Sequence, residues 1–116
     1  MKASAAVDAL AALAQETRLE AFRLLVQAGP DGLPAGTIAG RVDIPAPTLS
    51  FHLKELRSAG LVVAERQGRS IVYRADFDAM RSLIGFLTDQ CCRGIEAVPN
   101  PSCAPVALAR TRGEAR

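Results

Sequence analysis

The sequence predicts a mainly α-helical domain with a small β-hairpin, an α+β fold, and three observations predict it. Apolar residues recur at helical spacing in the first half of the chain, for example at Leu49, Leu53 and Leu56. Two short runs rich in β-branched residues follow, separated by Gly68. Helical spacing then returns from Phe77 onward. A chain of 116 residues, 49% of them hydrophobic, suits one such domain with one core.

Two helices are expected near the N-terminus. Val7, Leu10 and Leu13 repeat every third residue in an alanine-rich segment, which indicates a first helix of roughly ten residues. The alanine faces of this helix would allow close approach of another helix, for instance from a partner subunit. The next segment, ETRLEAFRLLVQAG, ends at Gly29 and carries one apolar stripe. That stripe consists of Leu19, Phe22, Leu25 and Val26.

The following stretch has the layout of a helix-turn-helix. Pro34 opens a short helix that runs to Val42, and a tight corner follows through Asp43-Ile44-Pro45. A second amphipathic helix is expected from Pro47 to Ala59. Proline suits a first helical position, and Gly60 suits the left-handed residue that ends a helix. A short helix, a tight corner and a second amphipathic helix together form the helix-turn-helix arrangement.

The outer face of the Pro47–Ala59 helix carries side chains that suit the major groove of DNA. Short polar groups near its start could reach base edges, and cations further on could reach phosphates. An ordinary surface helix is the alternative, and this window alone leaves the two about even. His52 lies beside the apolar stripe. A simpler interpretation is that it only forms a hydrogen bond, either within the domain or to a phosphate. The residues predicted to face DNA on this helix are Thr48, Ser50, Phe51, His52, Lys54 and Arg57.

A β-hairpin is expected directly after this helix. The runs LVVAERQ and SIVYRAD flank a turn near Gly68, and Arg66 and Arg69 lie near its tip. We interpret the hairpin as a basic wing that grips the flanking DNA backbone or minor groove. The net charge of +2 is too small to identify a nucleic-acid partner, but five basic and three acidic residues lie between Pro45 and Asp76. The predicted fold is therefore a winged helix-turn-helix.

A last helix is expected from Phe77, with apolar residues that step by three and four as in a helix packed on another helix. These residues are Phe77, Met80, Ile84, Leu87 and Cys91. An intramolecular core helix is the alternative. A seam between the subunits of a homodimer is favoured, because the small domain already has a core. We expect residues 1–92 to form a DNA-binding and dimerisation domain, and residues 93–116 to form an irregular tail that contributes one thiol.

Composition disfavours several other classes of protein. No apolar run approaches the length of a membrane span, and the first residues lack the leucine-dense run of a signal peptide. The cytoplasm is thus the expected location, where three cysteines are more readily thiols or metal ligands than a disulfide framework. An enzyme is not expected, because no base–nucleophile pair is visible and the sole histidine belongs to the predicted DNA-reading helix.

Several short motifs between Leu13 and Asp76 occur together. They are Leu13-Ala14 with Thr17-Arg18-Leu19, Pro47-Thr48-Leu49-Ser50, His52-Leu53-Lys54-Glu55-Leu56, Ala59-Gly60-Leu61-Val62 and the wing QGRSIVYR. This span resembles the ArsR/SmtB family of metal-sensing winged-helix repressors, and it covers more than half of the chain. The resemblance implies a homodimer paired through its terminal helices. It also implies a repressor that leaves double-stranded operator DNA when a metal ion or metalloid binds.

The cysteines depart from one known arrangement in that family. Members with the familiar arsenic site carry a cysteine pair in the helix before the recognition helix, whereas the matching stretch here, Leu33 to Ala39, has none. The only cysteines are Cys91, Cys92 and Cys103. The family also contains arsenic sensors whose thiols lie at such a C-terminal location, and this sequence resembles those.

Three thiols within 13 residues suit a soft ion. Trivalent arsenic or antimony takes three sulfur ligands, which matches the count, whereas a structural zinc site normally has four ligands. On an ideal helix Cys91 and Cys92 point about 100° apart, so joint binding requires the helix end to fray. The residues between Arg93 and Ser102 are enough for Cys103 to fold back. We predict As(III) or Sb(III) as inducer, bound by all three cysteines, and no organic cofactor.

Three hypotheses for function follow from these residues. The first is an arsenite- or antimonite-responsive repressor that binds operator DNA as a homodimer. The second is a repressor that senses redox state or another soft metal with the same cysteines. The third is a small thiol enzyme or metal-scavenging protein with no DNA role. Two simpler alternatives for the thiols also stay open: Cys91 is only a seam residue, or Cys103 forms a disulfide under oxidation.

Overall fold

The computed structural model describes residues 1–95, which fall into two units. The first unit is Met1–Phe86, and the second begins at Leu87. Cys103 and most of the predicted tail lie outside the described residues, so the predicted division at residues 92 and 93 stays a prediction. Among the described residues, no helix has the length and apolar character required to cross a membrane.

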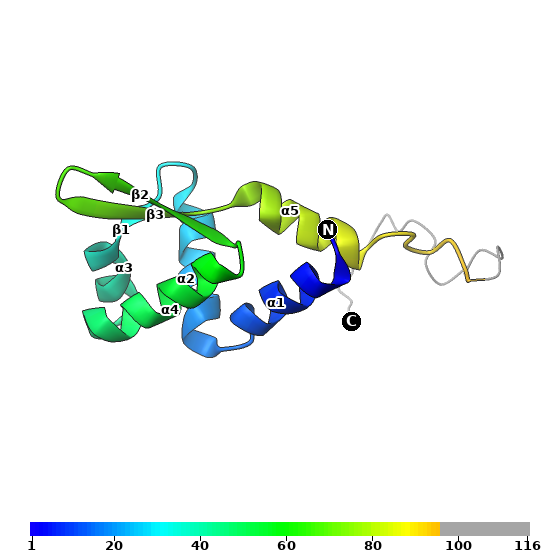
Figure 1. Ribbon diagram of the computed structural model, residues 1–116, viewed down its shortest axis with the longest axis horizontal. Coiled ribbons are helices and arrows are strands. Elements are labelled where there is room, and N and C mark those ends of the chain that lie inside the picture. The colour runs from blue at the N-terminus through cyan, green and yellow to red at the C-terminus, as the bar shows by residue number, and fades with distance from the viewer. Residues whose placement is uncertain (96–116) are drawn as a thin grey trace, which may run out of the picture. The chain divides into compact units, whose positions relative to one another are not determined.

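The described chain contains five helices and three short strands (Figure 1). In chain order they are α1 (Ala3–Leu13), α2 (Glu16–Ala28), β1 (Leu33–Pro34), α3 (Ala35–Val42), α4 (Ala46–Ser58), β2 (Val62–Gln67), β3 (Ser70–Ala75) and α5 (Phe77–Leu87). The strands form one antiparallel sheet in the order β1-β3-β2. The predicted mainly α-helical fold with a small hairpin is therefore confirmed.

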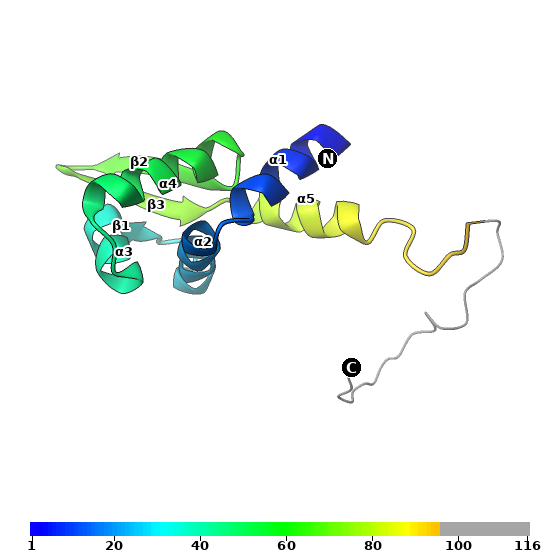
Figure 2. The same ribbon diagram turned by 90° about the horizontal axis from the view of Figure 1, so that it is seen from below.

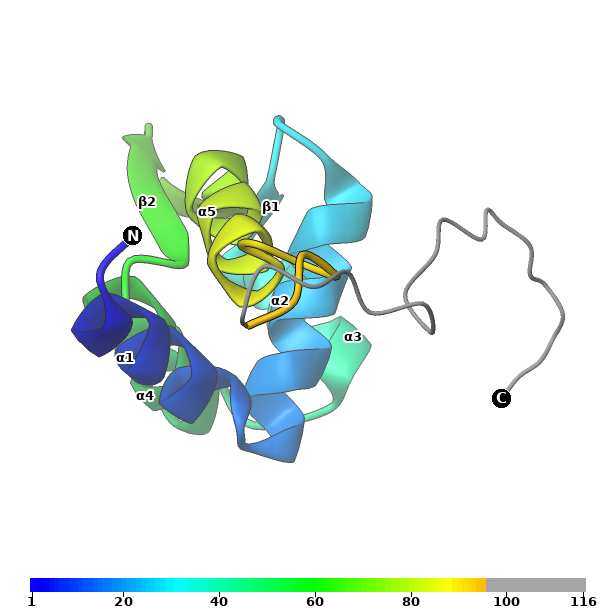
Figure 3. The ribbon, with the colours of Figure 1, turned by 90° about the vertical axis from the view of Figure 1, so that its right-hand side faces the viewer.

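The helix α1 packs through its alanines rather than through its larger side chains. Ala6, Ala9 and Ala12 are buried, and α1 contacts α2 and α4 (Figure 3). Val7 and Leu10 are instead 63% and 42% exposed. The alanine face that could have met a partner subunit therefore meets helices of the same chain. The apolar residues that indicated the helix from its sequence lie largely on its outer side.

The pair α3–α4 has the predicted helix-turn-helix form. Asp43 ends α3 in the left-handed conformation, with φ of 58°, and Pro45 leads into α4. Because α4 begins at Ala46, one residue earlier than predicted, Pro47 occupies its second position, where a missing N–H is equally harmless.

The other end of α4 is closed by a Schellman motif. Gly60 has a φ of 80°, and the N–H of Leu61 donates to the carbonyl of Leu56 at 3.0 Å. Leu49, Leu53 and Leu56 are each at most 1% exposed. The buried stripe and the fixed helix end together orient the opposite face of α4 outward.

The strand β1 is an element that the sequence did not reveal. Leu33 and Pro34 pair with Tyr73 and Val72 of β3. Gly32 permits this close approach, because its φ is 69° and a Cβ there would collide with the carbonyl oxygen of Tyr73. Two residues, one of them proline, are too few to show strand alternation.

The helix α5 divides its apolar residues between the core and the surface. Leu83 is buried, and Phe77 and Met80 are partly buried against the core, so the first half of the predicted seam packs within its own chain. Ile84 and Phe86 are instead 54% and 39% exposed. In the first unit, α1 and α5 lie at the end opposite the tip of the β2–β3 hairpin (Figures 1 and 2).

The chain leaves helical conformation before the first cysteine. Because α5 ends at Leu87, the prediction that Cys91 continues its helical seam is wrong. Turns follow instead: the N–H of Cys91 donates to the carbonyl of Thr88 at 2.9 Å, and Gln90 and Cys92 have positive φ values of 63° and 64°. Left-handed residues interrupt an α-helix, so both thiols lie on turns.

Candidate nucleic-acid interface

The helix α4 presents a polar, basic and aromatic face opposite its buried leucines. Phe51 is 56% exposed, which is unusual for so large an apolar side chain. His52 is half-buried at the edge of this face. The other predicted DNA-facing residues of α4 are all exposed: Thr48, Ser50, Lys54 and Arg57. Their side chains are thus available to a partner along the whole length of the helix.

The β2–β3 hairpin carries the two predicted wing arginines. Gln67 pairs with Ser70, so Gly68 and Arg69 form a two-residue turn, and Gly68 has a φ of 64°. Arg66 and Arg69 are both exposed. A tight turn therefore holds Arg69 at the tip, where a cation can reach a phosphate.

One hollow brings together predicted residues from α4 and the hairpin. Ser50 and Arg69 both line it, and so does the start of α3. The remaining lining residues are Pro34, Ala35, Gly36, Ser70, Ile71 and Tyr73. Arg66 and the other predicted residues of α4 do not line this hollow. A single DNA backbone could thus meet α4 and the hairpin at the same place.

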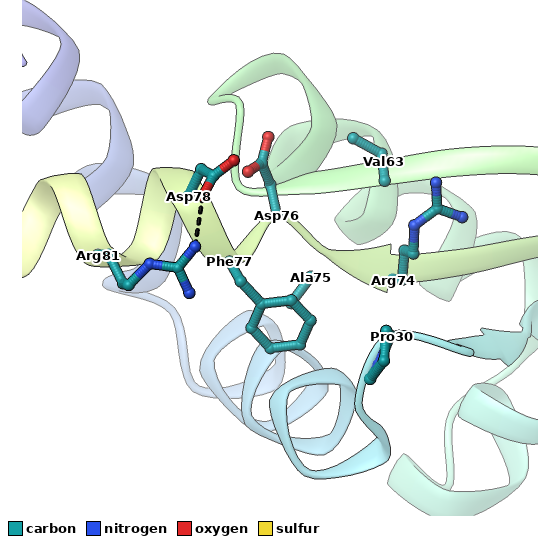
Figure 4. A pocket seen from close by; sticks show the side chains of 8 residues that line it. All are labelled: Pro30, Val63, Arg74, Ala75, Asp76, Phe77, Asp78 and Arg81. Carbon is teal, nitrogen blue, oxygen red and sulfur yellow. Dashed lines mark hydrogen bonds and ion pairs between the residues drawn. The ribbon is translucent and has the colours of Figure 1, made fainter.

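A second hollow lies where β3 meets α5, but its charged groups already interact within the fold (Figure 4). Arg81 pairs with Asp78, and Arg74 pairs with a glutamate of β2. The carboxylate of Asp76 accepts the N–H of Ala79 at 3.0 Å and so caps α5. The charged side chains that line this hollow therefore have structural partners, and their presence requires no ligand.

Arg18 is a residue of the candidate interface whose role sequence reasoning missed. Its Nη1 lies 3.2 Å from Nδ1 of His52, and its Nε donates to the carbonyl of Ala12 at 2.7 Å. The ring of His52 also meets that of Phe51 edge to face, with centroids 5.6 Å apart. Arg18 was noted only as part of a family motif, and 34 residues separate it from His52, so no local spacing connects the two.

In the second unit the thiols of Cys91 and Cys92 lie together. Their Sγ atoms are 3.4 Å apart, and the Cys91 side chain is exposed. Up to residue 95, no cluster of three potential metal ligands is present. The third predicted ligand, Cys103, lies outside the described residues. The structure therefore brings together two of the three predicted thiols.

Comparison with known proteins tests the fold and the DNA-facing elements independently. A family model described as a helix-turn-helix domain matches residues 13–65. The chain is 32% identical over 87 residues to the nodulation protein NolR of Rhizobium meliloti. The match covers 75% of this chain and 69% of NolR. The solved structure of an ArsR-like transcriptional regulator from Rhodococcus sp. RHA1 superposes with a TM-score of 0.64 at 30% identity, covering 72% of this chain and 76% of that one.

The chain belongs to the ArsR/SmtB family. Its members are DNA-binding transcriptional regulators, not enzymes, and the winged helix-turn-helix of this ArsR/SmtB protein is its DNA-binding domain. A further similar structure is the homodimeric winged helix-turn-helix DNA-binding domain Mb0332 of Mycobacterium bovis, described as a possible ArsR-family regulator. It has a TM-score of 0.62 and 30% identity, and the match covers 78% of this chain and 83% of that one.

Proposed function

We propose that this ArsR/SmtB regulator is an arsenite- or antimonite-responsive repressor. It binds operator DNA as a homodimer and leaves the DNA when As(III) or Sb(III) binds Cys91, Cys92 and Cys103. The observation that supports this choice of inducer is the 3.4 Å distance between the Sγ atoms of Cys91 and Cys92. At a metal–sulfur distance of about 2.3 Å, as for zinc, two sulfurs on one ion lie at most roughly 4.6 Å apart. The observed spacing meets that limit, and soft thiolates select soft ions.

The DNA contact is divided between α4 and the hairpin. Exposed Ser50 and Phe51 are suited to base edges and to the methyl group of thymine, and Arg69 is suited to a phosphate. Support for a single contact surface comes from the hollow that Ser50 and Arg69 share. Loss of Arg69 then affects all sequences alike, whereas loss of Ser50 affects discrimination between sequences.

The homodimer forms through α1 and α5. Val7 and Leu10 on α1 and Ile84 and Phe86 on α5 are large apolar side chains between 39% and 63% exposed, and exposed apolar groups of this kind are typical of protein interfaces. The Mb0332 domain, similar in fold and sequence, is described as homodimeric. A two-fold dimer places two copies of α4 on an imperfect palindrome whose half-sites are spaced to match the dimer.

Release follows from where the thiols lie in the chain. Cys91 and Cys92 lie a few residues after the end of α5, the helix that we assign to the dimer contact, and far along the chain from α4. A bound ion therefore acts by favouring a different arrangement of the two subunits, which changes the spacing of their α4 helices. Such a coupling between two sites is typically worth about 1–3 kcal/mol, and it is reciprocal, so operator DNA weakens arsenite binding by the same factor.

Ligand stoichiometry on the reduced protein tests the proposal. We expect one arsenite bound per chain, lost in Cys91→Ser and in Cys92→Ser, while both variants still bind DNA. The alternative is a repressor that senses redox state with the same thiols. We expect the protein in the cytoplasm, where these thiols are reduced. Release from DNA by peroxide but not by arsenite under reducing conditions would favour that alternative. A chain that binds arsenite but no DNA would point to a metal-scavenging protein.

A further inference from the structure

Arg18 connects three elements of the first unit through one side chain. Its backbone N–H donates to the side-chain oxygen of Gln15 at 2.9 Å, which caps the start of α2 and fixes where Arg18 lies. Its Nε donates to the carbonyl of Ala12 in the last turn of α1, where helix carbonyls lack partners within the helix. Its Nη1 meets Nδ1 of His52 on α4. The planar guanidinium makes the last two contacts at once.

The contact with His52 has only one chemically consistent form. A guanidinium has five N–H donors, no acceptor and a permanent charge, so Nδ1 of His52 must be the acceptor. A ring nitrogen that accepts carries no proton. The imidazole is then neutral, with its proton on Nε2, because the partner of one ring nitrogen sets the state of the other. Within residues 1–95, Nε2 makes no hydrogen bond.

We propose that Arg18 is a positioning residue for DNA recognition, which holds His52 in the Nε2–H form so that α4 offers a neutral N–H donor to a DNA phosphate. The inference rests on the DNA-facing role of α4. It assigns to Arg18 a task that is distinct from any direct contact with DNA. The edge-to-face contact between His52 and Phe51 restrains the same ring from a second side.

A phosphate is the acceptor that the position of His52 favours. His52 directly precedes Leu53 and follows Leu49 by three residues, so it lies on the flank of α4 beside the buried stripe. Phe51 lies on the side of α4 opposite the buried leucines, the side that we assign to the floor of the groove. The flanks of a helix in the major groove face the sugar–phosphate walls. His52 is half-buried, so part of its side chain is exposed.

The tautomer can be measured directly because His52 is the only histidine in the chain. With ¹⁵N-labelled histidine at mildly alkaline pH, the full chain gives one pair of ring-nitrogen signals. We expect essentially pure Nε2–H tautomer in the wild type. In Arg18→Lys we expect the mixture of both tautomers that a free imidazole shows. Arg18, Asp8 and Glu55 line one hollow, and the lysine keeps the positive charge beside the two carboxylates. A single ammonium, however, cannot contact both Ala12 and His52 as the planar guanidinium does.

DNA binding supplies the second readout, with a duplex obtained by in vitro selection on the purified protein as probe. Loss of one hydrogen bond to a phosphate should weaken binding about tenfold in Arg18→Lys and in His52→Ala. The salt dependence should stay unchanged, because a neutral donor releases no counterion, whereas a protonated histidine would contribute about 0.9 to the slope. Arg23→Lys, an exposed arginine on the same helix, is the matched control and should bind as the wild type does.

A double-mutant cycle separates positioning from general stability. His52→Gln keeps an N–H donor that does not depend on Arg18, so Arg18→Lys should cost nothing further in that background. Equal weakening by Arg18→Lys in both backgrounds would overturn the proposal. So would an Nδ1–H or protonated ring in the wild type, or a tautomer that Arg18→Lys leaves unchanged. Failure to select any duplex would instead refute the DNA-binding role, and the tautomer measurement would still test Arg18.

Discussion

The guanidinium of Arg74 on β3 lies 2.7 Å from the carboxylate of Glu65 on β2. This pair crosses the hairpin and neutralises one of its three arginines. Arg66 and Arg69 form no ion pair within residues 1–95. The hairpin therefore contains two arginines without an ion pair in the described residues, Arg66 and Arg69, and one arginine, Arg74, that is paired within the fold.

This difference gives a matched test of the wing. Arg69→Ala should weaken binding to all DNA sequences alike and lower the slope of log affinity against log salt by about 1, because one phosphate contact is lost. Arg74→Ala should leave that slope unchanged. Titrations at several salt concentrations measure both variants. Equal effects of the two substitutions, or no effect of Arg69→Ala, would show that the wing assignment is wrong.

Ser50 should contribute to discrimination between sequences. Ser50→Ala removes a short hydroxyl from the exposed face in the first half of α4, and one lost hydrogen bond to a base edge costs about 1 kcal/mol. The affinity for the selected duplex should fall while the affinity for random DNA stays constant. Ser58→Ala, at the last residue of α4, is the control. A parallel loss on both DNAs would assign Ser50 to the backbone instead.

Gly32 should be required for the entry of β1 into the sheet. Gly32→Ala forces a Cβ against the Tyr73 carbonyl and a left-handed conformation that itself costs about 1–2 kcal/mol, so the free energy of unfolding should fall by at least that amount. Gly40→Ala is the control: it lies inside α3 with open space around it, and should stabilise by about 0.5–1 kcal/mol. Urea denaturation measures both. An unchanged midpoint for Gly32→Ala would contradict the described approach of β1.

Ile84 should be part of the dimer contact. Ile84→Glu would bury an unpaired charge in that contact and should cost several kcal/mol, about 3–5. Sedimentation should then show folded or unfolded monomers. Ser82→Glu, an exposed polar residue of the same helix, should leave the dimer intact. A well-folded dimer that carries Ile84→Glu would exclude α5 from the interface.

The elements that sequence predicts well are those with local signals. Pro45, Pro47 and Gly60 mark the ends of α4, and three leucines at helical spacing mark its buried side, so its bounds agree within one residue. The signal for the hairpin, two short β-rich runs on either side of Gly68, is equally local. In contrast, β1 contains two residues and exists only because β3 is there to pair with it.

Most features that the sequence did not predict depend on contacts between segments that are distant in the chain. The spacing of Val7, Leu10 and Leu13 indicated that α1 is a helix, but close packing against helices of the same chain buries its small residues Ala6, Ala9 and Ala12 instead. Beyond the end of α5 at Leu87, Gln90 and Cys92 adopt left-handed conformations, and neither residue type favours them, so sequence did not predict these turns. The candidate thiol site was predicted from the number and spacing of the cysteines and from the family resemblance, and only Cys91 and Cys92 fall within the described residues.

Control of DNA binding by the thiols is the central claim, and a fluorescence-anisotropy titration with a labelled duplex tests it most directly. The reduced wild type should bind the duplex and release it when arsenite is added. The double variant Cys91→Ser, Cys92→Ser should bind the duplex with near-normal affinity, because neither residue belongs to α4 or the hairpin, and should remain bound in arsenite. Full arsenite release from this double variant would contradict the mechanism.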